Sequence, residues 1–168
     1  GGTVVAATSE SGCVVTNGMS QYSRNERNAN AGIVVGIAPQ DYRQDPAAAG
    51  PVNPLDGVAF QRRWESRAFE LGGGGYQAPA QLVGDFIKGQ RSSALGAVLP
   101  SYQPGVQLTD LAEPGRPSLP DYALEALREA LPAFDRQIKG FAMRDAVLTG
   151  VETRTSSPLR ITRGRDLQ

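Results

Sequence analysis

A polar loop near the end of the chain, Glu152 to Pro158, carries the densest set of side chains that could do chemistry. It holds a carboxylate at Glu152, a guanidinium at Arg154 and four hydroxyls. Short apolar runs at 146–151 and 159–161 flank it and favour strands. Such a density of hydrogen-bonding groups exceeds what a turn requires, which favours a binding loop. The alternative is a solvated loop whose hydroxyls satisfy local backbone donors.

Composition excludes several kinds of site. The 17 Lys and Arg residues balance the 17 Asp and Glu residues, so no net field favours nucleic acid or an anionic membrane. The chain has no histidine and a single cysteine, Cys13, which excludes a disulfide framework, a zinc site and a Ser-His or Cys-His pair. We therefore expect no metal, and we expect Cys13 to be a structural thiol.

The ends of the chain and its hydropathy bear on where the protein resides. Gly1-Gly-Thr-Val-Val lacks both an initiator methionine and the pattern of a secretory signal. No apolar run approaches the roughly 20 residues needed to span a bilayer. We therefore expect an internal segment or a processed product of a soluble, cytoplasmic protein.

The chain opens with β-structure. Residues 3–7, 13–16 and 33–38 are short apolar runs rich in valine and isoleucine, and each is predicted to be a strand. Ser9 to Gly12 resembles a hairpin loop with glycine at a positive φ. The connection from Thr16 to Gly32 is rich in Asn and Gly, which tolerate left-handed backbone angles. It is either a ligand-facing loop or a surface excursion.

Helical patterns dominate the middle of the chain. Asn53-Pro54 favours a helix start with Asn as the N-cap, and this helix is expected to end at the glycines 72–75. A second short helix is predicted over Pro79 to Lys88, with Gly89 as its stop. The four glycines follow a helix and not a strand, which disfavours a nucleotide-binding loop. Residues 90–117 carry four prolines and are expected to form a long loop.

The longest amphipathic pattern lies near the C-terminus, after a predicted Ser118 cap. Apolar residues repeat there at three- and four-residue steps and predict a core face: Leu124, Leu127, Leu131, Phe134 and Ile138. Pro132 is expected to kink or split this helix. Strands first, helices in the middle and a strand at the end predict an α+β fold, with the last strands returning to the opening sheet.

Several motifs together resemble a known family of FAD-dependent dehydrogenases, which are largely uncharacterised bacterial flavoproteins. The motifs cover nearly the whole chain: Gly1-Gly-Thr-Val-Val-Ala-Ala-Thr-Ser-Glu, Thr16-Asn-Gly-Met-Ser, Asn28-Ala-Asn-Ala, Pro79-Ala-Gln-Leu-Val-Gly-Asp-Phe and Leu148-Thr-Gly-Val-Glu-Thr-Arg-Thr-Ser-Ser-Pro-Leu-Arg-Ile. The resemblance implies that residues 1–168 form one domain, inserted on the substrate side of a Rossmann-type FAD-binding domain. This chain lacks the glycine-rich FAD fingerprint of that partner domain.

The resemblance also implies site residues. The candidates for the FAD cofactor are Gly1, Gly2, Arg154, Thr155, Ser156 and Ser157. The candidates for a small-molecule substrate are Asn17, Met19, Asn30 and Glu152. Arg154 is expected to face an anionic or carbonyl group, while the glycines allow close backbone approach.

Two classes of function follow. In the first, the chain is the inserted domain of an FAD-dependent oxidoreductase, in which the flavin performs the redox step. In the second, it is a non-catalytic binding or interaction module that acts without flavin. The missing fingerprint supports the second class for the chain alone and leaves the first open for a longer protein.

Overall fold

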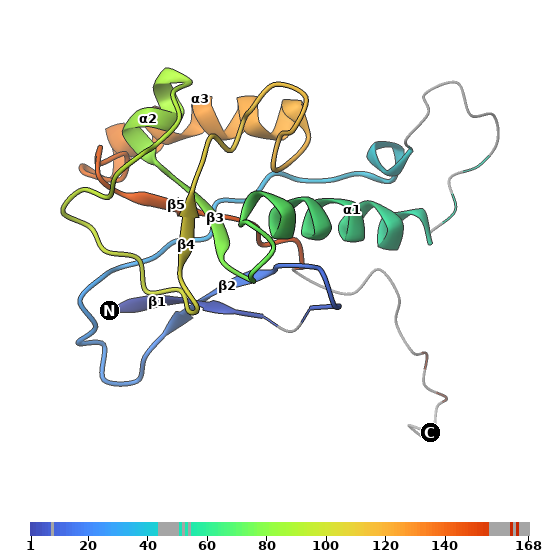
Figure 1. Cartoon of the computed structure of the whole chain (residues 1–168), viewed down its shortest axis with the longest axis horizontal. Helices are drawn as coiled ribbons and strands as arrows, with labels where there is room; N and C mark the ends of the chain where they lie inside the picture. The colour runs from blue at the N-terminus through green and yellow to red at the C-terminus, as the bar shows by residue number, and fades with distance from the viewer. Residues whose placement is uncertain are drawn as a thin grey trace.

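The structure, a computed structural model, describes residues 1–7, 9–43, 51, 53, 55–154, 162 and 164. It confirms the predicted α+β class, with two small sheets and helices packed against them (Figure 1). In chain order the elements are β1 (Gly2–Ala6), β2 (Thr16–Ser20), the 3-10 helix η1 (Pro39–Tyr42), α1 (Asp56–Leu71), β3 (Ala78–Leu82), α2 (Val83–Lys88), β4 (Val106–Leu108), α3 (Asp121–Gln137) and β5 (Val147–Thr149). No helix in these ranges is both long and apolar enough to cross a bilayer.

The chain opens with an antiparallel hairpin of β1 and β2, in which Gly2 pairs with Ser20 and Ala6 with Thr16. Gly12 has a φ of +75° in the connection, as the predicted turn requires. The second strand starts at Thr16, so its predicted range of 13–16 is wrong. The preceding residues 13–15 are buried against α1, and the Val14 amide donates to the Glu65 carbonyl (3.0 Å).

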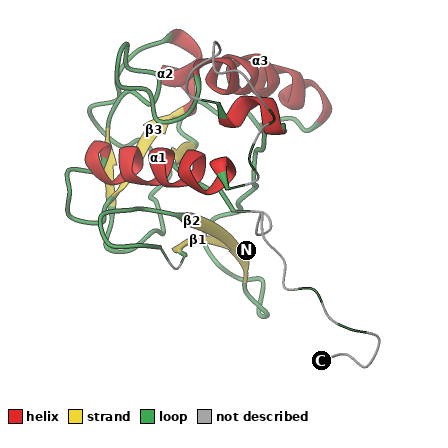
Figure 2. Cartoon of the chain, turned by 90° about the vertical axis from the view of Figure 1, so that its right-hand side faces the viewer, coloured by secondary structure: helices red, strands yellow, loops and turns green. Residues whose placement is uncertain are grey.

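Helix α1 packs against β3 of the second sheet and lies on the same side of the hairpin as that sheet (Figures 1 and 2). A cluster of buried residues joins these three elements: Val14, Ala68, Ala78, Tyr102 and Val151. The helix begins at Asp56, later than predicted, because the Asn53 side chain accepts a hydrogen bond from the Leu55 amide (3.0 Å) in the turn before it. It ends before Gly72, as predicted, and a Cβ at Gly72 would lie 1.9 Å from the Gln77 carbonyl oxygen.

The second sheet has the order β4-β3-β5, with β3 parallel to β4 and antiparallel to β5. The helix predicted over 79–88 is wrong in its first half, where β3 is a strand buried along its whole length. Gln81 is buried there because its side chain donates to the Gln90 carbonyl (2.7 Å) and accepts from the Leu111 amide (2.8 Å). Only α2 is helical, and it ends at Gly89 in the left-handed region, as predicted. Strand β4 lies within the segment predicted to be a loop.

Helix α3 packs beside α2 at the far side of the second sheet from the hairpin (Figures 1 and 2). It continues through Pro132, so the predicted split into two helices is wrong. Ser118 does not cap it; the N-cap position is Pro120, and Ser118 is buried with its amide donating to the Leu111 carbonyl. The stripe is buried at Leu124 and Leu131 within a second cluster around Phe86, but its last residues are exposed.

Two predicted strands differ from the structure. Residues 33–38 form no strand, because no described segment pairs with them. The C-terminal strand β5 pairs with β3 and not with the opening hairpin. The link to the hairpin is instead a hydrogen bond from the Thr16 amide to the Val151 carbonyl (2.8 Å). The strand predicted at 159–161 lies outside the described residues.

Candidate functional site

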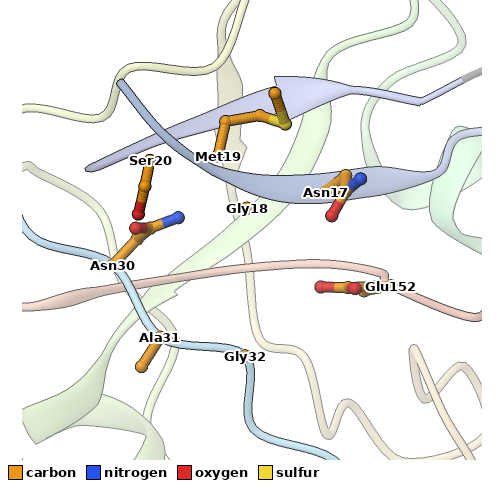
Figure 3. A pocket seen from close by; sticks show the side chains of 8 residues that line it. All are labelled: Asn17, Gly18, Met19, Ser20, Asn30, Ala31, Gly32 and Glu152. Atoms are coloured by element: carbon orange, nitrogen blue, oxygen red, sulfur yellow. The ribbon is translucent and has the colours of Figure 1, made fainter. Parts of the chain in front are cut away.

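A shallow pocket of about 250 Å³ lies between β2, the loop that follows it and the segment after β5 (Figure 3). Its lining residues are Asn17, Gly18, Met19, Ser20, Asn30, Ala31, Gly32 and Glu152. The four substrate candidates from the sequence therefore line one pocket, although they come from three separate segments. The lining carries two side-chain amides, from Asn17 and Asn30, one hydroxyl, from Ser20, and one formal charge, the Glu152 carboxylate.

The wall around Asn30 is built by close packing of its side chain on the hairpin. The Asn30 amide nitrogen donates to the Thr3 carbonyl (3.1 Å). A Cβ at Gly2 would lie 1.9 Å from Asn30 Oδ1, and one at Gly18 would lie 2.6 Å from Asn30 Nδ2. A Cβ at either position would displace the Asn30 side chain, so the two glycines allow this side chain to lie against the strands.

The first two glycines, expected at the cofactor, lie against the chain's own loop. The Gly1 amino group donates to the Arg24 carbonyl (2.8 Å), and the Gly2 amide donates to the Asn28 carbonyl (2.6 Å). A Cβ at Gly1 would lie 2.3 Å from the Glu26 nitrogen. Their need for close approach therefore has a structural cause, and their contact with a cofactor stays a prediction.

The opposite wall is Glu152, which is exposed. Its carboxylate makes no hydrogen bond or ion pair within the described residues, and Oε2 lies 3.8 Å from an ideal Cβ at Gly32. The backbone on either side of it is fixed. Val151 accepts from the Thr16 amide, and the Thr153 carbonyl accepts from Gln61 Nε2 (3.0 Å). Glu152 is thereby presented to the pocket by a segment anchored at two points, and its carboxylate retains its capacity to accept hydrogen bonds.

Arg154 is not among the residues that line the pocket. It pairs instead with the carboxylate of Glu65 on α1. Its Nε lies 2.8 Å from Oε1 and its terminal nitrogen lies 2.6 Å from Oε2, a bidentate pair. The Thr153 hydroxyl also donates to Glu65 Oε1 (2.8 Å). Glu65 is fully buried, while 40% of the Arg154 side chain is exposed. Hydrogen bonding to Glu65 raises the pKa of the guanidinium above its ordinary value.

Besides burial, the Glu65 carboxylate also affects the pKa of the Cys13 thiol. Burial raises the pKa of this thiol, and the nearby Glu65 carboxylate raises it further. A thiol whose pKa is raised is largely protonated near neutral pH and is a poor nucleophile. This agrees with the structural role expected for Cys13. Within the described ranges, no three His, Cys, Asp or Glu side chains are grouped so that they could hold a metal ion.

Residues 1–155 match the family model described as FAD-dependent protein, C-terminal domain-like. The chain belongs to this FAD-dependent family. It is also 50% identical, over all 168 residues, to an uncharacterized protein of Clostridium beijerinckii. The chain spans only 30% of the length of that relative.

The pocket of this FAD-dependent family member is small for a binding site. A volume of about 250 Å³ is below the roughly 300–1,000 Å³ typical of small-molecule sites. The pocket is open and is lined mainly by polar groups and glycines, so by itself it would not enclose a small molecule. Thr155, Ser156 and Ser157, the remaining cofactor candidates, lie outside the described residues.

Sequence reasoning missed two features of this FAD-dependent family member. Gly18, Ser20, Ala31 and Gly32 line the pocket without having been named as candidates. Glu65 was not among the predicted site residues, yet its carboxylate binds both Thr153 and Arg154. A signal was present: Glu65 is three residues before Ala68, which places it beside the apolar face.

Proposed function

We propose that this domain forms the substrate-side wall of the active site of an FAD-dependent oxidoreductase of the dehydrogenase type. The observation that carries the proposal is the pocket, in which β2, residues 30–32 and Glu152 converge to make an open and incomplete site. In this proposal residues 1–168 are one domain inserted beside a separate FAD-binding domain, which completes the site. The flavin supplies the redox chemistry when bound.

The residues of this chain would bind and orient the substrate. The Glu152 carboxylate accepts hydrogen bonds from donor groups, and the amides of Asn17 and Asn30 can donate or accept. Met19 adds a polarisable apolar surface next to them. Thr155, Ser156 and Ser157 are proposed to contact flavin where the chain continues, as are Gly1 and Gly2. Arg154 would act mainly through its pair with Glu65, which fixes the backbone beside Glu152.

The 168-residue chain alone is expected to bind FAD weakly or not at all. The pyrophosphate of a dinucleotide usually lies on a strand, glycine loop and helix N-terminus, and the sequence contains no such fingerprint. A visible absorption spectrum of the purified chain, before and after addition of FAD and gel filtration, measures this. Stoichiometric flavin that remains with the chain would contradict the prediction.

Glu152→Gln in a full-length flavoprotein that contains this domain tests the proposed site. Removal of a negative charge near the flavin should stabilise its anionic reduced form, so the midpoint potential should become more positive. Loss of the carboxylate should also raise KM for the substrate. The potential can be measured by spectrophotometric titration of the bound flavin, which does not require the substrate to be known.

The matched control is Glu125→Gln, an exposed glutamate on α3 that does not line the pocket. It removes the same charge at a distant position and should leave the potential unchanged. If Glu152→Gln also leaves both the potential and the substrate KM unchanged, the pocket does not face the active site. The domain would then fit the second class of function, a binding module that acts without flavin.

A further inference from the structure

Residues 31–37 have the sequence of a strand but pair with no other segment within the described residues. The run Ala-Gly-Ile-Val-Val-Gly-Ile contains four β-branched residues and no charge. None of its backbone amides or carbonyls forms a hydrogen bond within the part of the chain that the structure describes. Strand-forming side chains on an unpaired backbone are the features of an open sheet edge.

One face of this segment is already packed. Ile33 contacts the second core cluster, and Ile33 and Val35 are half-buried. Val34 points the other way and is 71% exposed, and Gly36 is also exposed. Over residues 33–36 the alternation has the period of two that a strand presents when one face lies on a core, and Ile37 beyond them is exposed. Residues 33–36 therefore already have one packed face before any partner pairs with them.

We propose that residues 31–37 pair, as an edge strand, with a strand of the FAD-binding domain of the same polypeptide. Pairing along one edge supplies partners for alternate amides and carbonyls of the segment, and an apolar cross-strand neighbour covers Val34. This assignment of the partner rests on the proposed function.

Two observations support this occupant. The relative that matches the whole chain is much longer, since the chain makes up 30% of it, so most of such a protein is available to pair. Ala31 and Gly32 begin the segment and also line the pocket. A strand paired along residues 31–37 would thus lie next to the pocket, where the proposed function places the FAD-binding domain. The pairing would join the two domains at the edge of the site.

Hydrogen exchange read by mass spectrometry tests the pairing in the full-length flavoprotein and in the 168-residue chain. The alternate amides of residues 33–37 that face the partner strand should exchange at least about a hundredfold more slowly in the full-length protein, because strand pairing protects them. Amides of α1 and α3 serve as the internal reference. They should be protected in both proteins and so report that the domain is folded.

Val34→Asp in the full-length protein places a charge on the exposed face of the proposed strand. It should increase the exchange rate of the 33–37 amides about tenfold or more, because an aspartate cannot be covered by an apolar neighbour without cost. The matched control is Ile138→Asp, a similarly exposed apolar residue at the end of α3. The control should leave exchange at 33–37 unchanged.

The outcomes separate this inference from the proposed function. Equally fast exchange at 33–37 in both proteins would overturn the pairing, while a flavin-loaded protein with the expected Glu152→Gln response would keep the proposed function. Protection at 33–37 in a full-length protein that carries no flavin would contradict the proposed function instead. It would show that the strand pairs, but that its partner is not an FAD-binding domain. Protection in the isolated chain that increases with its concentration would show self-association and overturn the proposed partner.

Discussion

Arg154→Ala is expected to lower the free energy of unfolding of this domain by about 3 kcal/mol. The change leaves the Glu65 carboxylate fully buried without the guanidinium that forms a bidentate pair with it. Among the described residues, the Thr153 hydroxyl is then the remaining hydrogen-bond donor to the Glu65 carboxylate. Because 40% of the Arg154 side chain is exposed, water can reach part of the vacated space, which keeps the cost at the lower end for a broken buried pair. Urea denaturation followed by circular dichroism measures the change.

The control for this prediction is Arg62→Ala. Arg62 also pairs with a glutamate, Glu10, at 2.8 Å, but both side chains are more than half exposed. Its loss should cost less than about 1 kcal/mol. In a Glu65→Gln background, Arg154→Ala should cost clearly less than in the native chain, since no buried charge is left unpaired. Unchanged stability of Arg154→Ala, with weaker flavin or substrate binding in the full-length protein, would favour the original interpretation of Arg154 as a binding residue.

The Arg154 pair shows why the chemistry of the polar residues 152–154 could not be predicted from the sequence. A run of carboxylate, guanidinium and hydroxyl groups predicts hydrogen bonds but not their partners. Thr153 and Arg154 both bind Glu65, whereas Glu152 faces the pocket. Glu65 is 89 residues from Arg154 along the chain, and no local pattern relates two such positions. Adjacent residues of one loop therefore have different roles that only the tertiary contact separates.

The fold was predictable where local patterns decide it. Gly12, the end of α1 before Gly72 and the end of α2 at Gly89 follow from backbone preferences of glycine. Strand β3 could not be predicted because it is buried on both faces and so lacks alternation. The buried side chain of Gln81 donates to the Gln90 carbonyl, which lies in an irregular loop. It accepts from the Leu111 amide, which is 30 residues away along the chain. Propensity and periodicity carry no information about such partners.

The strand predicted at 33–38 also shows that local patterns do not decide strand formation, because here a strand was predicted that the structure lacks. Its β-branched residues favour a strand, but the segment forms none within the described residues. A strand requires a partner, and none lies within the described chain. The disagreement between propensity and structure is thus informative, because it marks the segment that we propose to pair with another domain.

Leu131→Ala is the second large effect, with an expected loss of about 3 kcal/mol in the free energy of unfolding. Leu131 is 1% exposed and belongs to the cluster that joins α2 and α3, together with Val83, Phe86 and Leu124. Truncation removes three buried carbon atoms and leaves a cavity that the two helices can close only in part. The change should lower the urea midpoint without altering the slope of the transition.

Ile138→Ala, seven residues further along the same stripe, is the matched control. Ile138 is 63% exposed and lies just beyond the end of α3, so its truncation should cost less than about 0.5 kcal/mol. Leu127 is half-buried at the edge of the cluster, and its alanine variant should fall between the other two. The sequence pattern alone treats all three positions alike, whereas burial ranks them. A loss at Ile138 equal to that at Leu131 would show that the end of the stripe is covered in solution, because an exposed side chain has no cavity to leave.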